Sequence, residues 1–165
     1  LPQNLATENS FGAEFTGSYS AFTWWKTDAS FNFFRAITDG SNLSDEFKSD
    51  TYSWLVRLLS RVTVWKNTDI QLRGNYEAPQ QTPQGRRKSI ATMDLAVSKD
   101  ILKDKATLTL NVLDVFNSRR YRSITEGVNF YTENMSQGRL RQVNLTFNYR
   151  LRQAKKKVKE TLEQE

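Results

Sequence analysis

Residue types that carry most enzyme chemistry are unevenly represented in this chain of 165 residues. Histidine and cysteine are both absent. Their absence removes imidazole and thiolate metal sites, Cys-His nucleophile pairs, Ser-His-Asp triads and disulfide frameworks. We therefore expect that the chain is not an enzyme, and that it has no catalytic residue, cofactor or metal.

The acidic side chains most suited to binding a cation lie in one polar stretch between residues 38 and 50. They are Asp39, Asp45, Glu46 and Asp50. Carboxylate oxygens of this kind are ligands for Ca²⁺, but their spacing matches no known calcium-binding loop. A solvated loop is the better interpretation of this stretch.

Basic side chains give the chain a formal net charge of +6 and a pI near 9.6. A basic balance can indicate nucleic-acid binding, but residues 150–165 hold six bases against three acids and so supply +3 of it. Much of the rest is spread along strands and loops, so no nucleic-acid partner is expected. Two basic groups, 86–88 and 119–122, could attract anions or acidic lipopolysaccharide as an external ring, although ordinary loop charge is the preferred interpretation.

Seven stretches that alternate apolar and polar residues must position these side chains. The clearest sets Val143, Leu145, Phe147, Tyr149 and Leu151 against interleaved polar residues. A period of two is the signature of a strand with two unlike faces. We predict an all-β fold, an antiparallel transmembrane β-barrel wall of about seven strands, at 9–20, 27–33, 51–64, 68–78, 92–98, 106–112 and 139–151.

The two faces of these strands are predicted to meet different surroundings. The residues predicted to face lipid are Phe15, Tyr19, Phe31, Phe33, Trp54, Leu58, Leu72, Tyr76, Leu95, Leu108, Leu110, Leu145, Phe147 and Tyr149. The polar residues predicted to face the lumen are Arg57, Arg61, Arg73, Glu77, Asn144 and Asn148. The polar set cannot form a dry core, which favours a wall with water or a plug behind it over a soluble ligand-binding β-barrel.

The connections between the predicted strands alternate in length. They are short after the first, third and fifth strands and long after the second, fourth and sixth, as periplasmic turns and external loops of outer-membrane barrels are. Trp24 and Trp25 stand at the first short turn and Trp65 at the second. These tryptophans could cap a soluble sandwich core, but with the loop pattern they predict an interfacial aromatic belt. We therefore expect the cell outer membrane as location, with the loops external.

Mean hydropathy is low, at -0.66. No segment approaches the roughly 18 consecutive apolar residues that a spanning helix needs, so a helical membrane protein is excluded. Barrel strands expose only alternate residues to lipid, and their mean hydropathy stays low as well. Low hydropathy is therefore neutral between a soluble β-domain and an outer-membrane barrel.

Four segments carry a family resemblance: residues 4–20, Trp24-Trp25-Lys26, residues 111–120 and residues 143–151. Through them the chain, from about residue 4 to 152, resembles the C-terminal part of the outer-membrane β-barrel proteins allied to TonB-dependent receptors. The resemblance implies a barrel of about 22 strands around a plug domain, and nutrient uptake driven through TonB. Its motifs mark strand ends and loops rather than a chemical site.

The strand count bears on how much of a barrel this chain forms. Bacterial single-chain barrels have an even number of strands, eight at least, so seven strands do not close. Either a strand is hidden in 114–138 or before residue 9, as in a small stand-alone barrel, or the chain is part of a larger wall. We expect the second, with residues 1–152 as barrel strands and loops and 153–165 as a periplasmic tail. Its partners would be outer-membrane lipid, the rest of the barrel and its plug, and TonB through a missing N-terminal part.

Overall fold

The computed structural model describes residues 7–40, 48–65, 67–127 and 129–151. These residues form β1 (Thr7–Phe22), β2 (Trp25–Asp39), β3 (Lys48–Trp65), β4 (Thr68–Glu77), β5 (Gln80–Thr82), β6 (Gly85–Arg87), β7 (Ile90–Ile101), β8 (Ala106–Leu113), β9 (Tyr121–Gly127), β10 (Phe130–Ser136) and β11 (Gln142–Tyr149). Among the described residues, no helix is long and apolar enough to cross a membrane.

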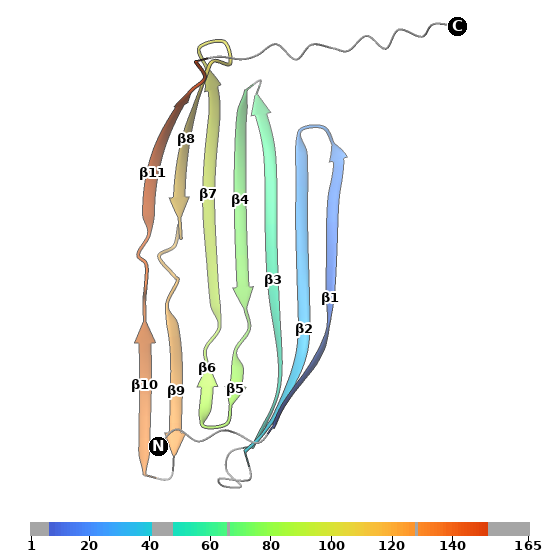
Figure 1. Cartoon of the computed structure of the whole chain (residues 1–165), viewed down its shortest axis with the longest axis vertical. Coiled ribbons are helices and arrows are strands. Elements are labelled where there is room, and N and C mark those ends of the chain that lie inside the picture. The colour runs from blue at the N-terminus through green and yellow to red at the C-terminus, as the bar shows by residue number, and fades with distance from the viewer. Residues whose placement is uncertain (1–6, 41–47, 66, 128, 152–165) are drawn as a thin grey trace, which may run out of the picture.

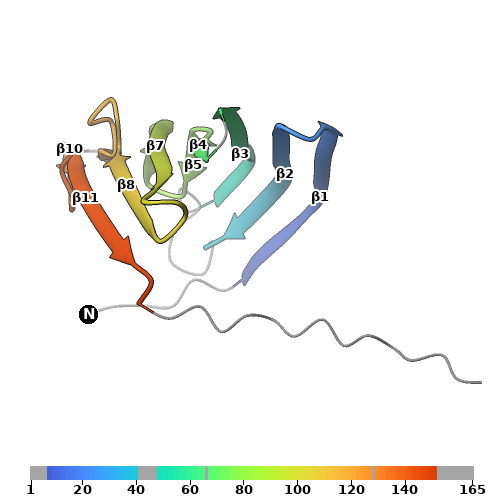
Figure 2. The same ribbon diagram turned by 90° about the horizontal axis from the view of Figure 1, so that it is seen from above.

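Seven of the strands form one antiparallel sheet in the order β1-β2-β3-β4-β7-β8-β11. They lie side by side in Figure 1, and Figure 2 shows the sheet curved into an open arc. Strands β1 and β11 are its two edges and do not pair with each other. The prediction of an all-β antiparallel wall is confirmed, and within the described residues this wall does not close.

The other four strands form a second sheet, in the order β10-β9-β6-β5. Figure 1 shows it continuing the wall beyond the ends of β4, β7 and β8, and we call it the extension. The long connection at 79–89 was expected to be a loop, which is wrong because it contains the paired strands β5 and β6. The connection at 114–138, where a hidden strand was the alternative to a loop, contains the paired strands β9 and β10. Strands β9 and β10 are polar along much of their length, so their backbone pairing leaves no period-two signal in the sequence.

Smaller differences concern the strand ends. Strand β7 continues to Ile101, beyond the turn expected to begin at Lys99. The final strand is Gln142–Tyr149, shorter than the predicted 139–151, and Leu151 lies after it in a bend. The predicted tail at 153–165 and residues 41–47 of the expected second loop lie outside the described residues.

The short connections gather at one end of the seven-stranded sheet, the upper end in Figure 1. Two of these turns are joined, because Asn67 Nδ2 donates to Asp104 Oδ1 at 2.7 Å and Asp100 N donates to Asn67 O at 2.8 Å. Asn67 and Asp104 have φ of 69° and 64°, which Asn and Asp tolerate better than most residues. The turn residues therefore fix this end of the sheet.

Neither face of the sheet is covered by another layer of described residues. Among the residues that the structure describes, the buried apolar side chains are only Ala36, Ala78, Ala106 and Ile124, and no large side chain is fully buried. A soluble domain buries its apolar strand faces against a second layer. The apolar face of this sheet has no such partner in the described chain.

Candidate functional site

Cross-strand register decides which side chains share a face, because residues directly opposite in an antiparallel pair point to the same side. Phe15 lies opposite Phe31, Phe31 opposite Val56, and Val56 opposite Tyr76. Following the register across all seven strands puts every residue predicted to face lipid on one side, here named the apolar face. Every residue predicted to face the lumen lies on the other side, here named the polar face.

Large side chains of the apolar face are exposed throughout its width. Phe15 at the β1 edge is 64 % exposed, Leu58 in the middle 44 % and Leu145 at the β11 edge 69 %. Soluble monomers rarely expose continuous apolar surface beyond a few hundred Å². A face of this kind needs an apolar environment.

An aromatic cluster marks the short-turn end of the apolar face. The Phe22 and Trp24 rings stack with centroids 5.3 Å apart, and Tyr19 meets Trp25 edge-on at 5.7 Å. Trp25 Nε1 also donates to Ser60 Oγ at 2.9 Å, so the indole has a polar partner. Trp65, predicted as the third belt residue, ends β3 and is 73 % exposed. Amphipathic rings are typical of the level of lipid headgroups.

A second rim, which the sequence prediction missed, lies at the opposite end of the same face. Arg35 lies opposite Phe11 and Tyr52, with its guanidinium carbon 5.8 Å and 5.2 Å from their ring centroids. Arg35 Nε also donates to Asp50 Oδ1 at 2.7 Å. The available signal was the position of Arg35, two residues after Phe33 in the alternating run. A cation flanked by aromatic rings suits the edge of an apolar band.

The two rims are spaced as a bilayer requires. Trp25 and Arg35 lie on the same face of β2, about 33 Å apart along the strand at about 3.3 Å per residue. A strand tilt of about 40° reduces this to about 25 Å, the height of the apolar band on transmembrane barrels.

Polar side chains fill the opposite face without closing it. Arg57, Arg73 and Asn75 line an open hollow of ≈ 370 Å³ together with Asp28 of β2. Arg61 Nη2 donates to Gln71 Oε1 at 3.2 Å, whereas the side chains of Arg57 and Arg73 have no hydrogen-bond or ion-pair partner among the described residues. Glu77 lies opposite Leu55 and Ile90, and Asn144 and Asn148 lie opposite Asn111 and Thr107. Side-chain pairing across the strands is therefore partial in this set.

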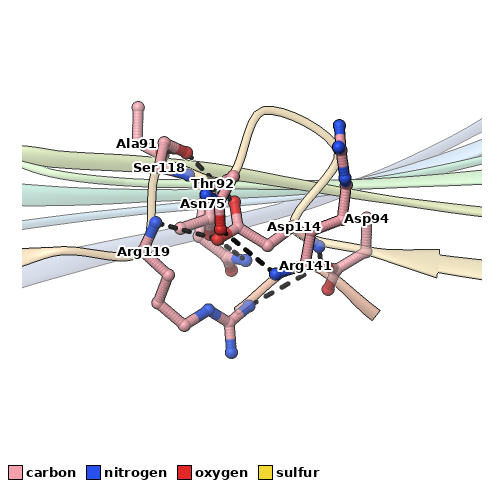
Figure 3. A network of polar contacts seen from close by, with 9 residues as sticks. Asn75, Ala91, Thr92, Asp94, Asp114, Ser118, Arg119 and Arg141 are labelled. Atoms are coloured by element: carbon pink, nitrogen blue, oxygen red, sulfur yellow. Dashed lines mark hydrogen bonds and ion pairs between the residues drawn. The ribbon is translucent and has the colours of Figure 1, made fainter. Parts of the chain in front are cut away.

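A buried carboxylate organises the turn that links β8 to the extension. Asp114 is only 2 % exposed, and its Oδ1 and Oδ2 accept hydrogen bonds of 2.9 Å from Ser118 N and Arg119 N. Figure 3 shows Ser118 and Arg119 beside the carboxylate, joined to it by dashed lines. The turn is also tied to the sheet, because Asp114 N donates to Asp94 Oδ1 at 2.8 Å.

The hydrogen bonds of this turn also affect the pKa of Asp114. Burial raises the pKa of Asp114, but the hydrogen bonds from Arg119 N and from Ser118 outweigh it, so this pKa is below its usual value. Asn117 Oδ1 accepts from Gln137 Nε2 at 2.9 Å and from Arg141 N at 3.1 Å. The turn therefore joins β8, the extension and the approach to β11. In the sequence, residues 111–120 are recognisable only as a family motif, which gives no sign of this role.

The basic groups weighed as one external ring are divided by the fold. Arg119 Nη2 lies 3.6 Å from Asp94 Oδ1, a residue of the polar face. In the extension, Lys88 Nζ instead bonds Glu133 Oε1 at 2.7 Å, and Lys88 N donates to Arg122 O. The Lys88 hydrogen bond lowers the pKa of Glu133, and the charges of Lys88, Arg122 and Arg86 lower it further.

The acidic stretch weighed as a calcium loop is only partly described. Asp50 is ion-paired with Arg35, and residues 45 and 46 lie outside the described residues. In the described part of the chain, no group of three or more acidic residues is arranged to hold a metal ion.

Comparison with known proteins gives one match. The model of an outer membrane protein beta-barrel family matches residues 1–149. No curated protein and no solved structure matches the chain. The match covers the described strands and the resemblance segments at 4–20, 24–26 and 111–120, together with most of 143–151.

Proposed function

The chain belongs to the outer membrane protein beta-barrel family, and we propose that it forms wall and external loops of a TonB-dependent receptor-like transporter for nutrient uptake. Its seven-stranded sheet would cross the outer membrane with the apolar face against lipid and the polar face toward the lumen. The end that bears the extension would be external.

The observation that carries the membrane assignment is the unbroken apolar face between two aromatic rims. It extends from β1 to β11 and separates Tyr19, Phe22, Trp24 and Trp25 at one end from Arg35 at the other. Lipid satisfies such a face without any further protein layer. Every strand between the edges has backbone partners on both sides, as spanning strands require.

A larger barrel is favoured by the two free edges. An unpaired strand edge in hydrocarbon leaves backbone groups that cost several kcal/mol each. Strands β1 and β11 are such edges in the described sheet, so further strands of the same wall would pair with them. The proposed barrel has about 22 strands.

A plug is favoured by the polar face. The hollow beside Arg57 and Arg73 opens on that face, and the two guanidinium groups have no partner among the described residues. A domain inside the lumen would supply acceptors for them. TonB would act on the transporter through that domain.

The proposed function is tested on the full gene product in its own membrane. We expect it to fractionate with the outer membrane and to migrate differently on a gel before and after heating. Uptake of nutrients should depend on TonB and on the proton gradient of the inner membrane.

Two negative results would contradict different parts of the proposed function. A soluble product without heat-modifiable migration would contradict the membrane wall. A heat-modifiable membrane protein whose deletion impairs no TonB-dependent uptake would leave the wall intact and contradict the transporter.

A further inference from the structure

Positive charge is concentrated in the extension and in the connections that lead into it. Segments 79–89 and 117–138 hold six arginine or lysine residues against two glutamates, a net charge of +4. Residues 1–78, 90–116 and 139–149 hold twelve basic and thirteen acidic residues, a net charge of -1. The fold therefore gathers in a small region a charge that the sequence distributes over two separate segments.

Strand pairing brings Arg86, Lys88 and Arg122 onto one face of the extension and leaves Arg87 on the other. Arg86 lies opposite Ile124, which lies opposite Glu133. Lys88 N bonds Arg122 O, so these two residues are neighbours across β6 and β9. Because Glu133 is the acidic partner of Lys88, it neutralises only part of the local charge.

Two hollows lie beside these cations. One, of ≈ 250 Å³, is on the face of Arg87, with Tyr121, Ser123 and Asn134 in its lining. The other, of ≈ 530 Å³, is lined by Lys88, Arg120 and Arg122. The Arg122 side chain has no hydrogen-bond or ion-pair partner among the described residues, which leaves its guanidinium donors available.

We propose that the extension is a binding site for phosphate groups carried on a saccharide. Guanidinium groups bind phosphate oxygens through paired, charge-assisted hydrogen bonds. In the larger hollow, the groups of Ser89, Asn117 and Ser118 would accept and donate hydrogen bonds to sugar hydroxyls, and the exposed ring of Phe116 offers a flat surface to the sugar. Lys88 supplies a further positive charge to the same hollow.

The same chemistry can come from two sources. One is the phosphorylated glucosamine headgroup of lipid A in the surrounding outer leaflet, and the other is a soluble phosphorylated glycan. The inference stands apart from transport, because a wall without transport activity would bind either source equally well.

Binding is measured with the whole protein, in detergent for the soluble probe and in phosphatidylcholine nanodiscs for the lipid probe. The probes are diphosphoryl lipid A and its deacylated glucosamine disaccharide bisphosphate, and the unphosphorylated disaccharide is the reference. The test variant is Arg120→Gln with Arg122→Gln, which removes two charges from the larger hollow. The matched control is Lys103→Gln with Lys105→Gln, which removes two charges from the short-turn end of the sheet.

We expect the phosphorylated probe to bind and the test variant to weaken binding about tenfold or more, because each substitution removes a charge-assisted contact. The control should bind as the parent does, and Arg120→Lys with Arg122→Lys should retain part of the affinity. Heat-modifiable migration of each variant verifies folding.

The two phosphorylated probes distinguish the lipid headgroup from the soluble glycan. Binding of both phosphorylated probes supports a site for free saccharide phosphates, and binding of lipid A alone supports a headgroup site. Equal binding of phosphorylated and unphosphorylated disaccharide, equal losses in test and control variants, or binding of neither phosphorylated probe would overturn the proposal.

Discussion

The seven-stranded sheet and the extension share antiparallel pairing, but their side chains are arranged on different rules. In the sheet, adjacent residues such as Leu58 and Leu59 belong to opposite faces, and the apolar face continues from strand to strand. In the extension, the neighbours Phe130 and Tyr131 are both large, aromatic and exposed. Its buried Ile124 lies between Arg86 and Glu133.

The strands of the sheet and those of the extension must meet different requirements. A strand that borders lipid needs one apolar face, so its alternation is imposed by the membrane. A strand beyond the apolar band needs only backbone partners, and polar side chains satisfy that condition equally well. Amphipathic alternation therefore marks the lipid-facing wall and leaves its continuation unmarked.

The largest effect is expected from a charge placed at the centre of the apolar face. Leu58 lies in the row of Ala29 and Gly74, midway between the two rims. We expect Leu58→Lys to reduce the free energy of unfolding in lipid vesicles by about 2–4 kcal/mol, the cost of a cation at the bilayer midplane. Reversible denaturant unfolding in vesicles measures it.

Leu59→Lys is the matched control for that substitution. Leu59 is the next residue on the same strand, but it lies on the polar face beside Arg73. We expect a change of less than about 1 kcal/mol there, because substitutions in a polar lumen are tolerated. Equal losses for the two variants would contradict the assignment of the faces.

A somewhat smaller effect is expected at the turn between sheet and extension. Asp114→Ala removes the acceptors of Ser118 N and Arg119 N, and a buried donor left unsatisfied costs about 1–3 kcal/mol. We expect faster hydrogen exchange at the amides of residues 115–120, with little change in the middle of β3. Uniformly faster exchange across both regions would show that the turn is not a separate unit.

The same carboxylate predicts a local pH dependence. The pKa of Asp114 is lowered in the folded state, so its stabilisation is fully present above the unfolded pKa of about 3.9 and is lost as pH falls through the folded value. Pepsin should therefore cut the turn faster as pH drops below about 4. In Asp114→Asn, which does not titrate, the cutting rate should show no such step beyond pepsin's own pH profile.

The smallest effect is expected at the rim beside Arg35. Its ion pair with Asp50 is partly exposed, and exposed pairs contribute little to stability. We expect Arg35→Leu to leave the denaturant midpoint of unfolding nearly unchanged and to leave the fold unchanged. A loss as large as that of Leu58→Lys would mean that the rim supports the fold rather than marking the edge of the band.

The strands that border two environments were predictable and the others were not. Phe147 and Asn148 differ in chemistry because their surroundings differ, so the sequence reports the faces of β11 directly. Residues Gln80–Thr82 and Gly85–Arg87 are polar throughout, and only their pairing with each other and with β9 makes them strands. Tertiary pairing of this kind leaves no local periodicity to detect.

The candidate sites follow the same division. The positions of Trp24 and Trp25 were predictable because tryptophan followed by lysine at a turn is typical of the membrane–water interface. The partners of Asp114 were not, because its carboxylate depends on the backbone course of the following five residues. Arg119 contacts Asp94 of the seven-stranded sheet, whereas Arg122 belongs to the extension, and this separation likewise depends on the course of that turn.

A nitroxide scan of β3 in lipid vesicles tests the central claim most directly. Single labels at successive positions from 54 to 62 would be measured for accessibility to oxygen, which partitions into lipid, and to a polar nickel chelate. We expect oxygen accessibility to peak at the even positions, which lie on the apolar face, and chelate accessibility to peak at the odd positions. High chelate accessibility at the even positions, or no alternation, would contradict a lipid-facing wall.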